Sequence, residues 1–261
     1  MKMRIKIIGP DGQIKADTKG DKYVRLVYPA AYEEGDTITV YSNVPGYIIL
    51  CAEDSIIPVF GYLKSEYSLI VPFGEKRASY SPKSFCGNTH LLYARNAEDW
   101  EMKQYRNLAL NPLDNHGNTG FFPHVQANIE TRGESVFAAR NAIDGNTASE
   151  GHGPWPYESW GINKRDDAEI KINFGQKVFI DRLIFTLRAD FPHDNWWKQA
   201  KITFSDNSEL TPAFQKGGLP QEFLLSPKTV EWLIMSNMEK DETDPSPFPA
   251  LVQLEVFGKP A

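Results

Sequence analysis

Short apolar runs alternate along the chain with clusters of Gly, Pro, Asn and Asp, and helical periodicity is almost absent. In runs such as residues 3–9 (MRIKIIG) and 169–175 (EIKINFG), apolar and polar residues alternate, which is typical of half-buried β-strands. The 18 prolines lie mostly at the edges of such runs, which agrees with strands because proline is excluded from central ladders. The pattern predicts an all-β protein, with strands at 3–9, 23–28, 36–42, 47–52, 68–73, 90–95, 169–175, 180–188, 200–206, 222–226, 229–235 and 251–258.

The chain divides near a charged segment, residues 96–105, which is expected to form one short helix or a linker. Five of the six tryptophans lie beyond this segment, and no strong internal repeat is present. A length of 261 residues suits two ordinary domains. We therefore predict two β-sandwich domains in series, residues 1–105 and 106–261.

The formal net charge is −6, and the excess of negative charge lies entirely after residue 105. Proteins that bind nucleic acid need a basic surface, and neither part of the chain offers one. A hydrophobic content of 41% with 12% aromatic residues leaves enough apolar material for packed cores. A nucleic-acid partner and global disorder are both disfavoured.

Signals for export, membrane insertion and disulfide bonding are weak. The first residues lack the long apolar run of a secretory signal, and no stretch is long enough to span a bilayer. The default compartment is therefore cytoplasmic, with an extracellular one open if a leader is missing. Cys51 and Cys86 could pair, although buried free thiols are the preferred interpretation.

Residues 137–161 (FAARNAIDGNTASEGHGPWPYESWG) are rich in oxygen donors. Calcium prefers such oxygen ligands, from carboxylates, amides, hydroxyls and backbone carbonyls together. The local pattern alone favours a turn that satisfies its own backbone, since Asp-Gly-Asn is common in turns.

A wider set of motifs follows in order after residue 105. Asn107-Leu108-Ala109 opens the second part, the turn Ala142 to Gly145 follows, and the strand ending Phe174-Gly175 comes next. Ser205-Asp206-Asn207 and the closing segment Glu255 to Gly258 complete the series. Residues 106–261 thus resemble the discoidin, or coagulation-factor type C, domains and related carbohydrate-binding modules, which share a galactose-binding-like jelly-roll sandwich.

The resemblance implies one structural calcium ion where the Asp-Gly turn meets the last strand. Ser149 stands where the family usually has threonine, which keeps the hydroxyl group. The implied ligands are Asp144 and Glu255 by carboxylate, Ser149 by hydroxyl, and Asn141, Asn146 and Leu254 largely by backbone carbonyl.

The stretch 188–199 (RADFPHDNWWKQ) joins two predicted strands of this fold. The resemblance places its loop at one end of the sandwich, where carbohydrate-binding members contact sugars. An indole ring can stack on the C–H face of a sugar, and arginine donates to its hydroxyl groups. The expected ligand-binding residues are Arg188, His193, Asp194, Asn195 and Trp196, with help from Trp155 or Tyr157.

Structural roles compete with these assignments. Trp197 and Trp160 adjoin strands and are expected in the core, whereas Trp155 and Tyr157 lie near prolines in a rigid, exposed segment. Arg188 could instead pair with Asp190 or Asp194 at the surface, where an ion pair contributes little.

The predicted function is non-catalytic recognition of a neutral or weakly charged saccharide. No common catalytic motif is present, so an enzyme is the minority hypothesis. A hydrolase or lyase would use the cluster of His193 with Asp190 and Asp194. A third alternative is a protein-interaction module, and the first domain has no assigned role.

Overall fold

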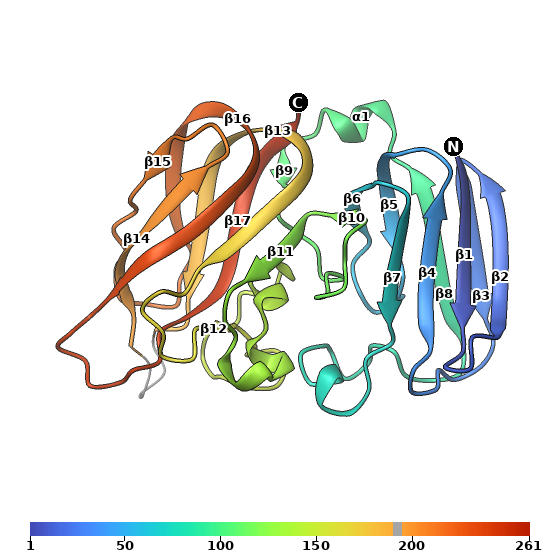
Figure 1. Ribbon diagram of the computed structural model, residues 1–261, viewed down its shortest axis with the longest axis horizontal. Helices are drawn as coiled ribbons and strands as arrows, with labels where there is room; N and C mark the ends of the chain where they lie inside the picture. Colours follow the sequence, from blue (N-terminus) through green and yellow to red (C-terminus); the bar gives the residue numbers. More distant parts are fainter. Residues whose placement is uncertain (190–194) are drawn as a thin grey trace.

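The computed structural model describes residues 1–189 and 195–261 and contains three β-sheets (Figure 1). The N-terminal sheets lie on one side of the molecule and the C-terminal strands on the other, with the green segment after α1 (Asp99–Met102) between them. The described helices are all short, and α1 falls within the segment expected to be a helix or linker. The prediction of an all-β protein is confirmed.

The first part is a sandwich of two antiparallel sheets. One sheet has the strand order β2-β1-β4-β7, and the other has the order β10-β6-β5-β8-β3. The strands are β1 (Lys2–Ile8), β2 (Ile14–Asp21), β3 (Tyr23–Tyr28), β4 (Thr37–Ser42), β5 (Gly46–Cys51), β6 (Val59–Leu63), β7 (Glu66–Ile70), β8 (His90–Asn96) and β10 (Phe121–Phe122).

The first core forms because alternate residues of these strands turn inward. Met3, Ile5 and Ile7 of β1 are buried, and the residues between them are partly exposed. Strand β2 was not predicted, because it is an edge strand whose side chains are exposed or half-buried and mostly polar. An edge strand with one partner buries too little side-chain area to show apolar alternation.

The first core extends beyond residue 105. Leu113 and Phe121 are fully buried in this core, and β10 pairs with β6. A Cβ atom at Gly61 would lie 2.5 Å from the Phe121 ring, so glycine is required for this close approach. The domain boundary at residues 105/106 stays a prediction, and the segment after it contributes to both parts.

The second part is built around long antiparallel strands. Its sheet has the order β12-β17-β13-β16-β14-β15, with β11 also paired to β13 and β9 to β17. Strands β13 and β16 bend strongly in Figure 1. The strands are β9 (Arg106–Asn107), β11 (His124–Ala127), β12 (Trp160–Gly161), β13 (Ile170–Leu187), β14 (Trp197–Phe204), β15 (Glu209–Leu210), β16 (Gln221–Lys240) and β17 (Ala250–Pro260).

Two pairs of predicted strands are each one continuous strand. The predicted strands 169–175 and 180–188 overlap the single strand β13, and residues 222–226 and 229–235 fall in β16. The register between β13 and β16 shifts between Asn173 and Val178 and then continues on the same partner. Gly175, with φ of 72°, adopts the left-handed backbone at this irregularity. The polar, glycine-containing interval therefore marks a bulge within the strand, not its end.

The second core holds the buried tryptophans. Trp160 and Trp197 are at most 1% exposed, and their ring centroids lie 6.3 Å apart. Trp196 is half-buried and packs against this core from outside. The prediction of core positions for Trp160 and Trp197 is confirmed. Trp196 and Trp197 differ in burial because neighbouring side chains at the start of β14 face opposite ways.

Neither cysteine is bonded to the other. Cys51 is buried, as expected, whereas Cys86 is exposed, so the expectation of two buried thiols was wrong for Cys86. Cys86 directly follows the turn at residues 82–85, and its thiol donates to the backbone carbonyl of Lys83 at 3.0 Å.

In the part of the chain that the structure describes, no helix is long and apolar enough to cross a membrane.

We predict that Phe121→Ala destabilises the first sandwich although it lies beyond residue 105. Removing a fully buried phenyl ring is expected to lower the free energy of unfolding by about 3–5 kcal/mol. Chemical denaturation followed by circular dichroism measures this loss. The control Trp100→Ala removes a side chain that is 61% exposed and should change stability little; equal effects of the two substitutions would contradict the assignment of Phe121 to the core.

Candidate functional site

A hollow of about 130 Å³ lies at one end of the second sandwich, beside β12. Its walls come from segments distant in sequence: the turns before β12, the segment after β12, the end of β13 and the loop between β16 and β17. Its lining residues are Thr131, Arg132, Phe137, His152, Gly161, Ile162, Asn163, Lys164, Arg188, Pro247, Phe248, Pro249 and Ala250.

Arg188 brings a buried cation to this pocket. It follows the last residue of β13, and its backbone N–H donates to the Ala250 carbonyl at 3.1 Å, which fixes its position beside β17. The side chain is 5% exposed, and Nη1 donates to Ser159 Oγ at 3.3 Å. The guanidinium carbon lies 5.8 Å from the centre of the Phe137 ring. A charge buried this far must be hydrogen-bonded, and a guanidinium with its five N–H donors can also serve a ligand.

Two phenyl rings flank the pocket, each with a cation nearby. Phe137 is buried and has the Arg132 guanidinium 5.5 Å from its ring centre. Phe248 is half-buried and has Lys164 Nζ 4.7 Å from its ring centre. None of the described lining residues carries a carboxylate, and Arg132 is itself paired with Glu134, with Nε 2.5 Å from Oε1. The described lining therefore combines apolar ring faces with cationic side chains.

The loop between β16 and β17, which carries Phe248, is held by Asn195. Its side-chain amide donates to the backbone carbonyls of Asp241, Asp244 and Ser246 at 2.9, 3.3 and 2.7 Å. Asn195 is 1% exposed, so these contacts are shielded from water. Trp196 adds to them, because its Nε1–H donates to Asp241 Oδ2 at 3.1 Å.

The structure places the predicted ligand-binding residues in different settings. Arg188 lines the pocket, whereas Asn195 and Trp196 support the loop that forms one wall of it. Their contact with a ligand stays a prediction. His193 and Asp194 lie outside the described residues, as does Asp190 of the catalytic alternative.

Trp155 and Tyr157 are exposed, as expected, at 41% and 36%. They do not line the pocket. The backbone N–H of Trp155 donates to the Ala78 carbonyl at 2.8 Å, so this segment faces the first part of the chain. Sugar contact by these two rings also stays a prediction.

The pocket residues that sequence reasoning missed include Phe137, Lys164 and Phe248. Phe248 could have been noticed in the sequence, because it is a single aromatic residue among prolines in a polar loop, residues 245–249 (Pro-Ser-Pro-Phe-Pro). Phe137 carried no local signal, because it lies in a short 3₁₀ turn, η3 (Ser135–Phe137).

A second polar cluster lies at the Asp-Gly turn. The carboxyl groups of Asp144 and Glu158 are close enough to interact, and Asp144 Oδ1 accepts from Gln253 Nε2 at 3.0 Å. Gln253 Nε2 also donates to the Asn141 carbonyl at 2.8 Å. Burial, with the nearby negative charge of Glu158, raises the pKa of Asp144 well above its usual range. Burial likewise raises the pKa of Glu158.

The residues of this cluster fit a cation. Glu158 Oε2 is buried without a hydrogen-bond partner beside a second carboxyl group, and the Asn141 carbonyl faces the same region through Gln253. Rotation of the Gln253 amide would turn an oxygen toward these groups in place of its NH₂. Oxygen donors of these kinds are the ligands that calcium prefers.

The six implied calcium ligands do not all belong to this cluster. Ser149 Oγ donates to the Gly218 carbonyl at 3.2 Å, and no hydrogen bond or charge interaction joins Glu255 to Asp144 in the described residues. Leu254 pairs with Phe185 in the β13–β17 ladder. Asn146 lies in the cluster, but through its amide, whose Nδ2 donates to Glu158 Oε1 at 3.0 Å.

No protein-family model matches the chain, and no match was found among curated proteins. Several solved structures are similar to it. A chitosan-binding module from a chitosanase/glucanase of Paenibacillus sp. IK-5 is 19% identical with a TM-score of 0.41, covering 58% of this chain and 98% of the module.

Two further structures were solved with saccharides. A family 32 carbohydrate-binding module from C. perfringens, in complex with galactose, is 18% identical with a TM-score of 0.39 and covers 51% of this chain and 91% of its own. The lectin domain of lectinolysin, in complex with Lewis B antigen, is 18% identical with a TM-score of 0.41 and covers 59% and 96%. These are the kinds of module that the motifs of the second part resemble. Every one of these TM-scores is below 0.5, so these likenesses by themselves assign no function to the chain.

We predict that Asn195→Ala destabilises the second sandwich by about 1–3 kcal/mol, because three backbone carbonyls lose a shielded donor. Thermal or chemical unfolding measures the loss. Gln176→Ala, which removes an exposed side-chain amide, should be near neutral. If Asn195→Ala were as stable as the Gln176→Ala control, Asn195 would not be a structural support for the loop.

Proposed function

We propose that the chain binds a saccharide in the pocket around Arg188. The observation that carries the proposal is the buried guanidinium of Arg188, 5.8 Å from the centre of the Phe137 ring, in a hollow at the end of the sandwich that Phe248 also lines. A sugar ring has C–H groups that pack on an aromatic face and hydroxyl groups that accept from a guanidinium.

The charge of the lining indicates what kind of saccharide fits. Arg132, Lys164 and Arg188 line the pocket, and Arg132 is paired with Glu134. The N–H groups of such side chains can donate to the hydroxyl oxygens of a neutral sugar or to the oxygens of a weakly charged one. We expect a neutral or weakly charged saccharide.

The size of the pocket favours the end of a glycan over an extended chain. A volume of about 130 Å³ is below the several hundred Å³ of most small-molecule sites. One terminal sugar unit would enter, and the following units would lie on the rim near Lys164.

A glycan array followed by calorimetry with the best ligand tests the proposal. Phe248→Ala and Arg188→Lys should each weaken binding at least about tenfold, a loss of about 1.4 kcal/mol. The first removes a ring face, and the second replaces a planar fork by a point charge. Trp100→Ala, far along the chain in α1, is the matched aromatic control and should bind like the wild type.

Circular dichroism and unfolding curves of both pocket variants separate loss of contact from loss of fold. A folded Phe248→Ala, Arg188→Lys double variant with wild-type affinity would refute the pocket as the binding site. Wells should also be analysed for sugar breakdown, because turnover would support the enzyme alternative with Asp190, His193 and Asp194.

We propose as well that a structural calcium ion binds at the Asp-Gly turn. Asp144 and the Asn141 carbonyl would hold it as expected, and Glu158 would supply a second carboxylate. Bound there, the ion would neutralise the two carboxylates and tie this turn to β17 through Gln253.

Calcium should therefore raise the midpoint of thermal unfolding, by mass action on the folded state. In differential scanning fluorimetry, adding calcium after chelation should shift the midpoint upward by several degrees, and Asp144→Asn should abolish the shift. Asp166→Asn is the control, since its side chain is 93% exposed. An unchanged midpoint in the wild-type protein would contradict the calcium site.

A further inference from the structure

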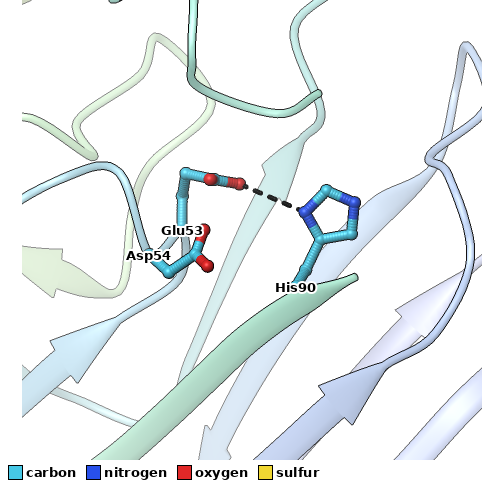
Figure 2. A group of neighbouring side chains, drawn as sticks. All are labelled: Glu53, Asp54 and His90. Carbon is cyan, nitrogen blue, oxygen red and sulfur yellow. Dashed lines mark ion pairs between the residues drawn. The ribbon is translucent and has the colours of Figure 1, made fainter. Parts of the chain in front are cut away.

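Three potential metal ligands meet at one end of the first sandwich, far in sequence from the saccharide pocket (Figure 2). Glu53 and Asp54 follow the end of β5, and His90 is the first residue of β8. Because β5 and β8 are antiparallel neighbours, the end of one strand lies beside the start of the other. One ligand atom from each of the three residues lies within 4.8 Å of the other two.

The polar atoms of this cluster lack partners although they are buried. Glu53 and His90 are each 1% exposed. Glu53 Oε2 and both ring nitrogens of His90 make no hydrogen bond. Burying polar groups without partners is unfavourable, so a ligand that satisfies them would be favoured.

The Glu53 carboxylate is oriented toward the imidazole. Its Oε1 accepts from the backbone N–H and the hydroxyl of Ser55, at 3.4 and 3.2 Å, and Ser55 Oγ in turn lies 2.8 Å from Ser84 Oγ. This anchoring leaves Oε2 pointing at His90 Nδ1, 3.7 Å away, as the dashed line in Figure 2 shows. Hydrogen-bonded neighbours that fix a carboxylate in this way are a common feature of metal sites.

The separation of 3.7 Å suits a bridging ion better than a direct contact. It is too long for a hydrogen bond. Two ligand atoms bound to one tetrahedral zinc ion at about 2.0–2.2 Å stand about 3.4 Å apart, so a small adjustment would bring both to the ion.

The neighbours of His90 hold its imidazole ring in place, and the cluster is open to solvent on the side of Asp54. The Tyr32 ring packs on His90 with 4.1 Å between ring centres, which holds the imidazole plane. Asp54 is exposed, so the cluster is reached from solvent on that side. A cation would relieve the repulsion between the neighbouring carboxylates of Glu53 and Asp54.

We propose that Glu53, Asp54 and His90 form a binding site for a divalent transition-metal ion of the zinc type. One imidazole and two carboxylates match the ligands that zinc accepts, whereas calcium and magnesium seldom take an imidazole. The ion would join the turn after β5 to the start of β8, with its remaining coordination position open to water through the Asp54 side.

Zinc binding to the full chain tests this site. The parent for the test is Cys86→Ser, because the exposed Cys86 thiol is itself a potential zinc ligand. Isothermal titration with zinc chloride and the metal content after desalting give affinity and stoichiometry. The parent should bind one zinc ion per chain at this site, and Asp54→Asn should weaken binding at least about tenfold by removing an exposed ligand without altering the core.

His90→Asn and the control Glu34→Gln complete the set. His90→Asn should also lose the zinc, and unfolding curves verify that it folds. Glu34 is an exposed carboxylate of the same sandwich outside the cluster, so Glu34→Gln should bind zinc like the parent. Absence of stoichiometric zinc in the parent, or unchanged affinity in Asp54→Asn, overturns the proposal. Failure of glycan binding would leave this result unaffected, because the two sites share no residue.

Discussion

The antiparallel pairing of β13 with both β16 and β17 is the constraint on which the second half of the protein depends. Ile172, Leu183 and Phe185 of β13 are fully buried, so this strand forms the centre of the second core. Its end at Leu187 delivers Arg188 to the pocket, and the backbone bond from Arg188 to Ala250 ties that residue to β17. The other wall follows from the same pairing, because the loop that joins β16 to β17 carries Phe248 and is held by Asn195. A rigid sheet thus sets the geometry of a site made mostly by loops.

Buried polar atoms without partners lie at both of the proposed ion sites. Arg188, in the saccharide pocket, donates to Ser159. Glu158 near the Asp-Gly turn and the pair of Glu53 and His90 in the first sandwich each leave such atoms unpartnered. In both places carboxylates lie close together, and an ion would add positive charge, which the first cluster already receives in part from the nearby Arg140. The two proposed ions differ in kind because only the second cluster contains an imidazole.

Much of the fold was predictable from the sequence, because period-2 alternation reports which side chains turn inward. That alternation identified most strands and the core positions of Trp160 and Trp197. It failed for the edge strand β2, whose side chains meet water, and it split β13 at a bulge. The candidate site was harder to predict: Arg188 was expected there from its residue type and loop, but the pocket that it lines is completed by Phe137 and Phe248 from distant segments. Asn195 has a side chain of a type that often contacts sugars. Only the three-dimensional structure shows that its amide donates to backbone carbonyls of the loop after β16.

The most direct test of saccharide binding in the pocket is a map of backbone chemical-shift changes when the best array ligand is added to isotope-labelled protein. Binding as proposed predicts the largest changes at residues 131–137, 161–164 and 247–250, in slow or intermediate exchange at the affinity measured by calorimetry. Changes confined to the segment around Trp155 and Tyr157, or to the first sandwich, would contradict the assignment of the pocket around Arg188 as the saccharide site.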